Sequence, residues 1–342
     1  MKTWEGYKHG VNLGGWLSQC NHTKERYEHF ITEPDVETIA KWGADHVRVP
    51  VDYDLVEEKD GTPKEEGYVY LDRAVEWCGK YGINMILDLH KTAGFSFDAG
   101  EQETGFFDSP EYQERFYRLW ESFAKRYGKY EDRLAFELLN EVTDKAFMPT
   151  WNRVTGICID RIRAIAPTIK ILVGGYWNNS IAAIPDLELP KDENIVYNFH
   201  CYEPLIFTHQ GAYWIDSMDR NFRIPLDASF AEMAEASRRE CSMAVEDFER
   251  FSLEDHLSSA YFDLYFEEAV KIAEERNVAL YCGEYGVIHL AQPQDILKWY
   301  EMIHASFEKF GIGRAAWSYK EMDFGLSDAH LDSVREQVVK LL

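Results

Sequence analysis

Short apolar runs alternate along this chain with longer segments in which apolar residues recur every three or four positions. Eight of the short runs are typical of strands that are buried on both faces. They are HGVNLGG (9–15), HVRVPV (46–51), NMILDLH (84–90), LAFELLNE (134–141), KILVGGY (170–176), IVYNFHCY (195–202), ALYCGEYGV (279–287) and GRAAWSYK (313–320). Strands separated by helical patterns predict parallel βαβ units.

The longer segments have the period of amphipathic helices, with charged residues opposite the apolar face. Several end in Gly or Asn, as helix C-termini do, and they span 35–43, 71–82, 110–128, 150–166, 261–277 and 295–311. Only the fifth crossover, 177–194, shows little helical pattern. Eight strand–helix units predict an α/β fold, a (β/α)8 TIM barrel that forms a single domain over residues 1–342.

The connection after the sixth strand is too long for an ordinary crossover. Residues 203–260 include FAEMAEASRRECSMAVEDFERFSLEDHLSSA, which has a mostly helical pattern. We therefore expect a helical subdomain inserted at the C-terminal face of the barrel, where barrel proteins form their sites. Phe207, Tyr213 and Trp214 in this insert either line one side of a cleft or pack the insert itself.

The net charge disfavours some classes of binding partner. Asp and Glu number 60 against 36 Lys and Arg, so the formal charge is -24 at pH 7. This field repels nucleic acid and anionic membrane surfaces, and no run of about eighteen apolar residues predicts a membrane span. The start, MKTWEGYKHG, lacks the apolar stretch of a secretory signal. The six cysteines form no CxxC pair, which favours buried free thiols over disulfides or a zinc site.

Polar and aromatic residues gather in or just after the predicted strands, mostly at their C-terminal ends. Taken singly, an arginine there is more often ion-paired, a histidine more often a hydrogen-bonded core residue, and a tryptophan more often core packing. In a barrel, however, the strand ends converge on one mouth, so their coincidence favours a functional site. The candidates are Arg48, His90, Asn140, Glu141, Trp177, Asn178, His200, Tyr202, Glu284 and Trp317.

Two glutamates are the strongest candidates for chemistry. Glu141 ends the fourth apolar run and Glu284 lies in YCGEYG, between two glycines that allow close approach of the backbone or a bend. Burying two carboxylates together is costly unless a ligand needs them. Such a pair suits cleavage of a glycosidic bond, where one group protonates the leaving oxygen and the other attacks the anomeric carbon. HExxH, GxSxG, Walker and strand-following GxGxxG motifs are absent, so we expect no metal and no cofactor.

Seven motifs together resemble glycoside hydrolase family 5 of clan A, and within it the clostridial endoglucanase C group, which also carries a helical insert after strand six. They are HGVNLGGWL, DHVRVPVDY, LDLHKTAG, FELLNEV, YNFHCYEP, LYCGEYGV and AAWSYKEMDFG, and the match runs from about residue 9 to 325. The resemblance implies a catalytic barrel and a retaining β-glycanase. Glu141 would be the general acid/base and Glu284 the nucleophile, with side chains about 5 Å apart.

The resemblance also implies supporting roles for the other candidates. Arg48 and Tyr202 would keep Glu284 ionised, and His200 would help set the protonation of Glu141. In the subsite of the cleaved sugar, the residues would be Asn140 on the 2-hydroxyl, His90 in the lining and Trp317 as the floor. One departure is Lys91, which stands where many cellulases of the family carry a second histidine or a small polar residue, and which we expect to place a cation at the rim.

These expectations lead to an endo-β-1,4-glucanase that also acts on mixed-linkage β-glucan. A β-1,3-glucanase is an alternative because GVNLGGWL is also similar to the opening of exo-acting members of the family, and a β-mannanase is a weaker one. A barrel that only binds carbohydrate is the alternative from another class, although both acids are present. The partner is a β-glucan chain, and we expect a monomer. A polymeric substrate predicts action outside the cell, even though no signal peptide is visible in this chain.

Overall fold

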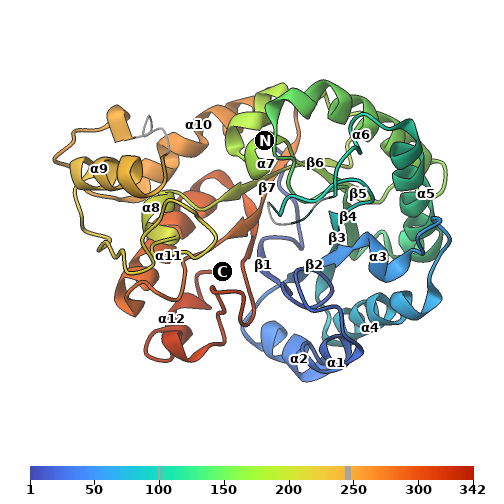
Figure 1. Ribbon diagram of the computed structural model, residues 1–342, viewed down its shortest axis with the longest axis horizontal. Helices are drawn as coiled ribbons and strands as arrows, with labels where there is room; N and C mark the ends of the chain where they lie inside the picture. The colour runs from blue at the N-terminus through green and yellow to red at the C-terminus, as the bar shows by residue number, and fades with distance from the viewer. Residues whose placement is uncertain (99–100, 102, 243–247) are drawn as a thin grey trace.

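The computed structural model describes residues 1–98, 101, 103–242 and 248–342 (Figure 1). Eight parallel strands pair in chain order and close into a barrel, which confirms the predicted fold. The strands are β1 (His9–Asn12), β2 (His46–Asp52), β3 (Asn84–Lys91), β4 (Leu134–Glu137), β5 (Lys170–Val173), β6 (Ile195–Cys201), β7 (Ala279–Tyr285) and β8 (Gly313–Ala316). No helix in the described part of the chain is long and apolar enough to cross a bilayer.

All six predicted helices surround the barrel; five lie within three residues of their expected bounds, and the one predicted at 71–82 begins six residues earlier. They are α2 (Glu33–Lys41), α4 (Glu65–Tyr81), α5 (Pro110–Tyr127), α6 (Met148–Arg163), α10 (Ser259–Glu275) and α11 (Pro293–Phe310). Shorter helices are α1 (Lys24–His29), α3 (Tyr53–Val56) and α12 (Arg335–Val338), with 3-10 turns η1 (Gly128–Tyr130), η2 (Lys145–Phe147) and η5 (Ala329–Leu331). Gly82 and Gly311 end α4 and α11 in the left-handed conformation, which costs a glycine little.

The fifth crossover contains no long helix, as its weak pattern predicted. It consists of α7 (Tyr176–Asn179) and the 3-10 helix η3 (Ile181–Asp186), which has Pro185 inside it. Trp177 and Asn178 have φ angles of 51° and 57°. This left-handed backbone conformation is uncommon for residues other than glycine. Here it sets the direction of both side chains, which follow β5 by a few residues.

Four predicted strands extend too far. The first and fifth apolar runs, 9–15 and 170–176, were expected to be strands throughout, but β1 ends at Asn12 and β5 at Val173. The fourth apolar run was expected to be a strand through Glu141, but β4 ends at Glu137. Trp317 was placed in the eighth strand, but β8 ends at Ala316 and Trp317 follows it. The apolar pattern continues past these ends because the next residues are also buried, and burial alone does not show where a ladder of hydrogen bonds stops.

The segment between β6 and α10 projects beside the barrel, at the left of Figure 1. It contains α8 (Leu205–Thr208), α9 (Phe230–Glu240) and the 3-10 turn η4 (Phe248–Arg250). The helical pattern predicted after residue 230 extends beyond α9, and 243–247 lie outside the described residues. From 251 to 258 the backbone is not helical, so the segment is less helical than expected. Ser229 begins α9 with a capping box that includes Glu232, which accounts for the start of this helix.

The inside of the barrel has two layers of opposite character. Near the N-terminal ends of the strands, a small apolar cluster fills the interior, with Trp4 stacked on Tyr7 at 4.0 Å between ring centroids. Its other members are Ile86, Ala135, Leu172, Val196, Ala279, Tyr281 and Ala315. Toward the C-terminal ends the inward side chains are polar and charged, and they carry the candidate site.

Candidate active site

Glu141 and Glu284 meet at the C-terminal mouth of the barrel, from opposite sides. Glu284 lies near the end of β7, and Glu141 follows β4 by a few residues. A carboxylate oxygen of each, together with a ring nitrogen of His200, lie within 4.8 Å of one another. Both side chains are largely buried, with exposed fractions of 9% for Glu141 and 6% for Glu284. The spacing matches the short separation of carboxyl groups in retaining glycosidases, roughly 5–5.5 Å, and not the 6.5–9.5 Å of inverting ones.

Two donors hold the carboxylate of Glu284. Arg48 Nη1 donates to Oε1 at 2.8 Å, and the Tyr202 hydroxyl donates to Oε2 at 2.9 Å. The glycines beside Glu284 are needed for close packing: a Cβ at Gly283 would lie 2.8 Å from Asn198 Oδ1, and one at Gly286 would lie 2.6 Å from the Trp317 carbonyl oxygen. The sequence prediction of a close approach at these glycines is confirmed.

Arg48 is the centre of a buried charge network. Its guanidinium donates to Glu137 through Nε at 2.6 Å and Nη2 at 2.8 Å, and it lies 3.0 Å from Asp88 Oδ2. Its remaining hydrogen bonds go to Asn12 Oδ1 at 2.9 Å and Asn140 Oδ1 at 2.7 Å. Burial raises the pKa of Glu137 and of Asp88 to about 7, against the opposing effect of Arg48. One guanidinium therefore faces three carboxylates, and it is held rigidly in place by them.

The carboxyl group of Glu141 has different neighbours. His200 Nδ1 lies 2.7 Å from Oε1, and Asn178 Nδ2 donates to Oε2 at 2.8 Å. Burial raises the pKa of Glu141 to about 7, although the Asn178 hydrogen bond lowers it in part. Burial lowers the pKa of His200 to about 4, so its ring is neutral near pH 7. Glu141 can thus carry a proton near neutral pH and release it there.

Asn140 offers a donor that no protein group uses. Its Oδ1 accepts from Arg48, which fixes the orientation of the amide, while its buried Nδ2 has no partner among the described residues. A buried donor without a partner is costly and often marks a position where a ligand binds. Asn179 also holds this segment in place, because its side-chain amide donates a hydrogen bond to the backbone carbonyl of Asn140.

His90 and Trp317 have parallel rings at the mouth of the barrel. Their rings are parallel within 3°, with centroids 5.9 Å apart, and Phe97 meets the His90 ring edge-on at 4.9 Å. His90 Nδ1 lies 2.5 Å from Asp88 Oδ2, so the same aspartate that faces Arg48 orients this ring. Both aromatic faces suit the C–H face of a sugar.

Lys91 does not place a free cation at the rim, and that expectation was wrong. Its side chain is buried, and Nζ forms ion pairs with Asp98 at 2.8 Å and Glu101 at 2.6 Å. The neighbours that neutralise it belong to the loop after β3, which the sequence pattern could not orient. Lys91 therefore anchors this loop.

The exposed aromatic residues lie on the side of Glu141 and of the insert. Trp177 is 56% exposed, and Tyr213 and Trp214 are 66% and 41% exposed. Trp214 contacts the ring of Phe324 at 6.2 Å, and Phe324 contacts Tyr202 at 5.7 Å, so this part of the insert connects to the site. Phe207 is fully buried, so it packs the insert and does not line a cleft.

Four residues of the site were missed by sequence reasoning: Asn12, Asp88, Glu137 and Asn179. For Asp88 and Glu137 a signal existed, because each is a charged residue inside an apolar strand and a buried charge requires a partner. Asn12 and Asn179 carry no such signal, since an asparagine near a glycine-rich turn is common in loops.

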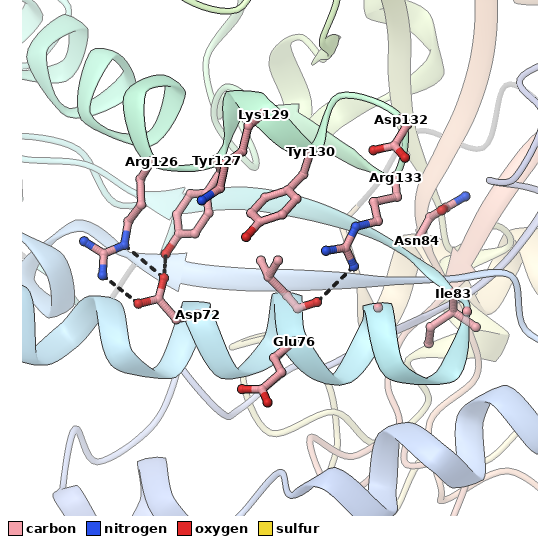
Figure 2. Close-up of a pocket in the computed structure, with 13 residues that line it drawn as sticks. Asp72, Glu76, Ile83, Asn84, Arg126, Tyr127, Lys129, Tyr130, Asp132 and Arg133 are labelled. Atoms are coloured by element: carbon pink, nitrogen blue, oxygen red, sulfur yellow. Dashed lines mark hydrogen bonds and ion pairs between the residues drawn. The ribbon is translucent and has the colours of Figure 1, made fainter.

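A groove with a cavity volume of ≈ 960 Å³ lies away from the two carboxylates, between α4 and the end of α5 (Figure 2). The two arginines that line it already have partners. Arg126 Nη2 donates to Asp72 at 2.6 Å, and Arg133 Nη1 donates to the Val75 carbonyl at 3.2 Å. We assign no chemistry to this groove.

Comparison with known proteins agrees with the geometry. The family model described as cellulase (glycosyl hydrolase family 5) matches residues 6–323. Cellodextrinase A of Ruminococcus flavefaciens is 50% identical over 305 residues, which cover 89% of this chain and 83% of that protein. Endoglucanase C of Acetivibrio thermocellus is 38% identical over 342 residues, 98% of each protein.

Solved structures share the fold. A hyperthermophilic endo-β-1,4-glucanase in complex with substrate superimposes with a TM-score of 0.76 at 22% identity, covering 95% of this chain and 92% of that one. The cellulose synthase subunit Z of Clostridioides difficile gives a TM-score of 0.76 at 24% identity, covering 98% of this chain and 99% of that one. At these identities the likeness concerns the barrel alone.

Proposed function

Because the chain belongs to glycosyl hydrolase family 5, we propose that it is a retaining endo-β-1,4-glucanase that cleaves β-1,4 and mixed-linkage β-glucans. One observation carries the mechanism: a carboxylate oxygen of Glu141 and one of Glu284 lie within 4.8 Å of each other at the mouth of the barrel. At that distance no water fits in line between an attacking base and the sugar, whereas direct attack by a carboxylate is possible.

In the first step Glu284 attacks the anomeric carbon while Glu141 protonates the leaving oxygen. Arg48 and Tyr202 donate to both oxygens of Glu284, which stabilises its charged, nucleophilic form. Glu141 begins this step protonated, as a pKa of about 7 allows. The bond from the anomeric carbon to the leaving oxygen breaks, and an ester between the sugar and Glu284 forms.

In the second step a water molecule takes the place of the leaving sugar. Glu141 is now ionised and removes a proton from this water, whose oxygen attacks the anomeric carbon and releases Glu284. The negative charge of Glu284 is lost in the ester, so the pKa of Glu141 falls and the same group can act as base. Neutral His200, 2.7 Å from Glu141, orients the carboxyl group throughout.

The remaining candidates bind the sugar whose bond is cleaved. Asn140 Nδ2, which has no partner among the described residues, would donate to the 2-hydroxyl, a contact that strengthens in the transition state. Trp317 and the parallel ring of His90 would form the floor of this subsite. Asn178 donates to the acid, so the exposed Trp177 beside it would contact the leaving half of the substrate.

A second candidate function within the same chemistry is hydrolysis of short cellodextrins. The 50% identical relative is named cellodextrinase A, which favours a short cellodextrin as the substrate.

All residues that hold the two carboxylates come from a single chain, which supports action as a monomer.

The test is release of reducing ends from carboxymethylcellulose, barley β-glucan, laminarin, mannan and cellotetraose, with Glu141→Gln beside the unchanged protein. Activity on the first two that collapses in the variant supports the endoglucanase. Activity confined to cellotetraose selects the cellodextrinase, and activity confined to laminarin or mannan overturns the substrate while keeping the mechanism. Absence of activity on all five substrates would favour the alternative of a barrel that only binds carbohydrate.

A further inference from the structure

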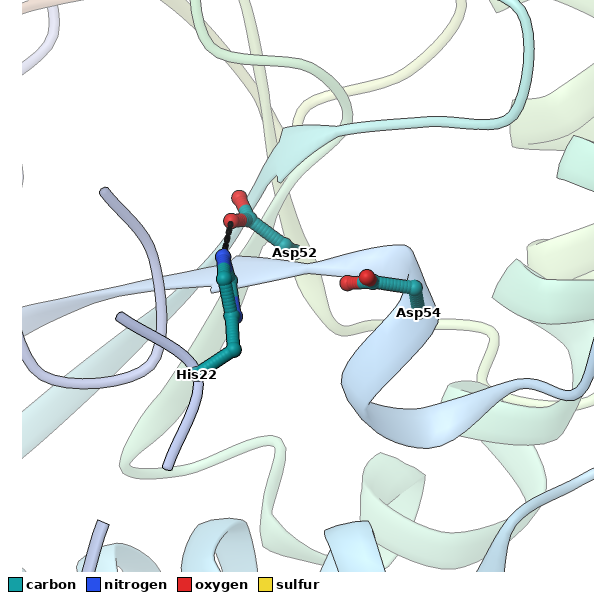
Figure 3. Close-up of side chains that lie close together, drawn as sticks. All are labelled: His22, Asp52 and Asp54. Carbon is teal, nitrogen blue, oxygen red and sulfur yellow. Dashed lines mark ion pairs between the residues drawn. The ribbon is translucent and has the colours of Figure 1, made fainter. Parts of the chain in front are cut away.

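We propose that His22, Asp52 and Asp54 form a binding site for a divalent transition-metal ion, with Zn²⁺ as the best probe (Figure 3). The three side chains come from neighbouring parts of the fold. His22 precedes α1, Asp52 ends β2, and Asp54 lies in the short helix α3. An ion bound here would link the loop after β1 to the end of β2. The inference does not depend on the proposed function.

The spacing of the ligand atoms fits a small ion. One atom from each residue lies within 4.8 Å of the others, and His22 Nε2 lies 3.6 Å from Asp52 Oδ2. Two ligands of a tetrahedral Zn²⁺, each about 2.0–2.1 Å from the metal, lie roughly 3.4 Å apart. The His22–Asp52 pair is therefore close to the geometry that coordination requires. Asp54 is exposed, so its side chain can rotate to close the remaining distance.

Asp52 is a buried residue with one carboxylate oxygen free for a ligand. The residue is 2% exposed, and its Oδ1 accepts a hydrogen bond from the Ser18 hydroxyl at 2.6 Å. Oδ2 accepts no hydrogen bond from any described residue, and it points toward His22 (Figure 3). Because the residue is largely buried, a metal ion bound to Oδ2 would stabilise its charged form.

His22 is oriented in the way that metal-binding histidines are. Its Nδ1 lies 2.9 Å from the Tyr27 hydroxyl, which leaves Nε2 directed at Asp52. With its proton on Nδ1 and donated to this hydroxyl, the ring leaves Nε2 free to coordinate the ion. A donor set of one imidazole and two carboxylates favours Zn²⁺ over Mg²⁺, which prefers oxygen ligands alone.

The charges around the cluster also favour a cation. The nearby ammonium group of Lys91 acts on Asp52, but it is shared with Asp98 and Glu101, which form ion pairs with it. The second cluster with ligand spacing, Glu141 with His200 and Glu284, has its carboxylate oxygens occupied by hydrogen bonds. It is therefore the weaker of the two for a metal.

The test is titration of the metal-free full chain with ZnCl₂ in a calorimeter, for the unchanged protein and for His22→Ala and His29→Ala. His29 is the matched control, because it is an exposed histidine 3.8 Å from a carboxylate, that of Glu25, on α1. We expect one Zn²⁺ site in the unchanged protein and in His29→Ala, and binding weakened at least about tenfold in His22→Ala. MgCl₂ should give no comparable heat.

Asp54→Asn provides an independent variant, since it changes an exposed side chain by a single atom. Zn²⁺ should raise the unfolding temperature of the unchanged protein and of His29→Ala, and of Asp54→Asn by less. Equal Zn²⁺ affinity in His22→Ala and the unchanged protein would overturn the proposal. Binding that survives in both cluster variants but disappears in Glu141→Gln would assign the ion to the catalytic carboxylates instead, and would overturn it as well.

Discussion

The surroundings of Glu284 and Glu141 differ although the two side chains are chemically identical. Around Glu284 there are a guanidinium and a phenol, which both donate to its carboxylate. Around Glu141 there are a neutral imidazole and an amide, and burial raises its pKa to about 7. A full positive charge thus contacts only one of them.

This difference separates the roles of two equal groups. In the proposed mechanism the carboxylate next to Arg48 attacks, while the buried one without a cation exchanges a proton near neutral pH. Arg48 itself is held by Glu137 and Asp88, so the asymmetry depends on residues that never touch the sugar. Substitutions at these residues should remove parts of this asymmetry.

The largest expected effect comes from Glu284→Gln, which removes the nucleophile. We expect kcat to fall by on the order of 10⁴-fold or more, because no neighbouring group can form the covalent intermediate. Binding of cellotetraose, measured by calorimetry, should remain. Glu301→Gln, which alters an exposed glutamate of α11, is the control and should keep full activity. Comparable turnover in the two variants would contradict the assignment of Glu284.

Glu141→Gln should lower kcat on β-glucan by about 10²- to 10⁴-fold, since the leaving oxygen is no longer protonated. An aryl cellobioside with a good leaving group needs no such proton, so formation of its glycosyl-enzyme should be affected much less. The burst of released phenol in the first turnover measures this step. If the burst and the hydrolysis of β-glucan fell by the same factor, the assignment of Glu141 as the general acid would be contradicted.

Tyr202→Phe should lower kcat/KM by roughly 10- to 100-fold, because it removes one hydrogen bond to the charged carboxylate of Glu284. The stability of the fold should change little, since the ring remains. Tyr130→Phe, in the groove distant from the site, is the matched control. Equal kinetics for both variants would show that Arg48 alone suffices to hold Glu284.

The smallest effect is a shift in pH dependence. The Asn178 amide donates to the ionised form of Glu141 and so lowers its pKa; removing it should raise the pKa further. Activity requires protonated Glu141, so the alkaline limb of kcat/KM, near pH 7 in the unchanged protein, should move upward by up to about one pH unit. Asn178→Gly keeps the left-handed backbone that this position needs. A downward shift in the measured profile would mean that the amide has the opposite effect.

Much of the fold was predictable because its signals are local. The eight apolar runs and six amphipathic helices each occupy a short stretch of the chain. Few folds other than a barrel accommodate eight strands that alternate with helices in this way. The pair Asn140 and Glu141 was recognisable because a polar pair directly after a buried run is unusual. The helical content of the insert was overestimated, since residues 251–258 have helical spacing but no helix.

The sequence by itself determined the barrel, the two acids and the mouth where they meet, because periodicity and strand order belong to the chain. Only the tertiary structure decided the partners: Glu137 and Asp88 on Arg48, Asn178 on Glu141, and Asp98 and Glu101 on Lys91. These pairs join different strands and loops of the barrel. The energy of a buried charge depends on which side chains lie within a few ångströms of it, and spacing along the chain does not contain that information.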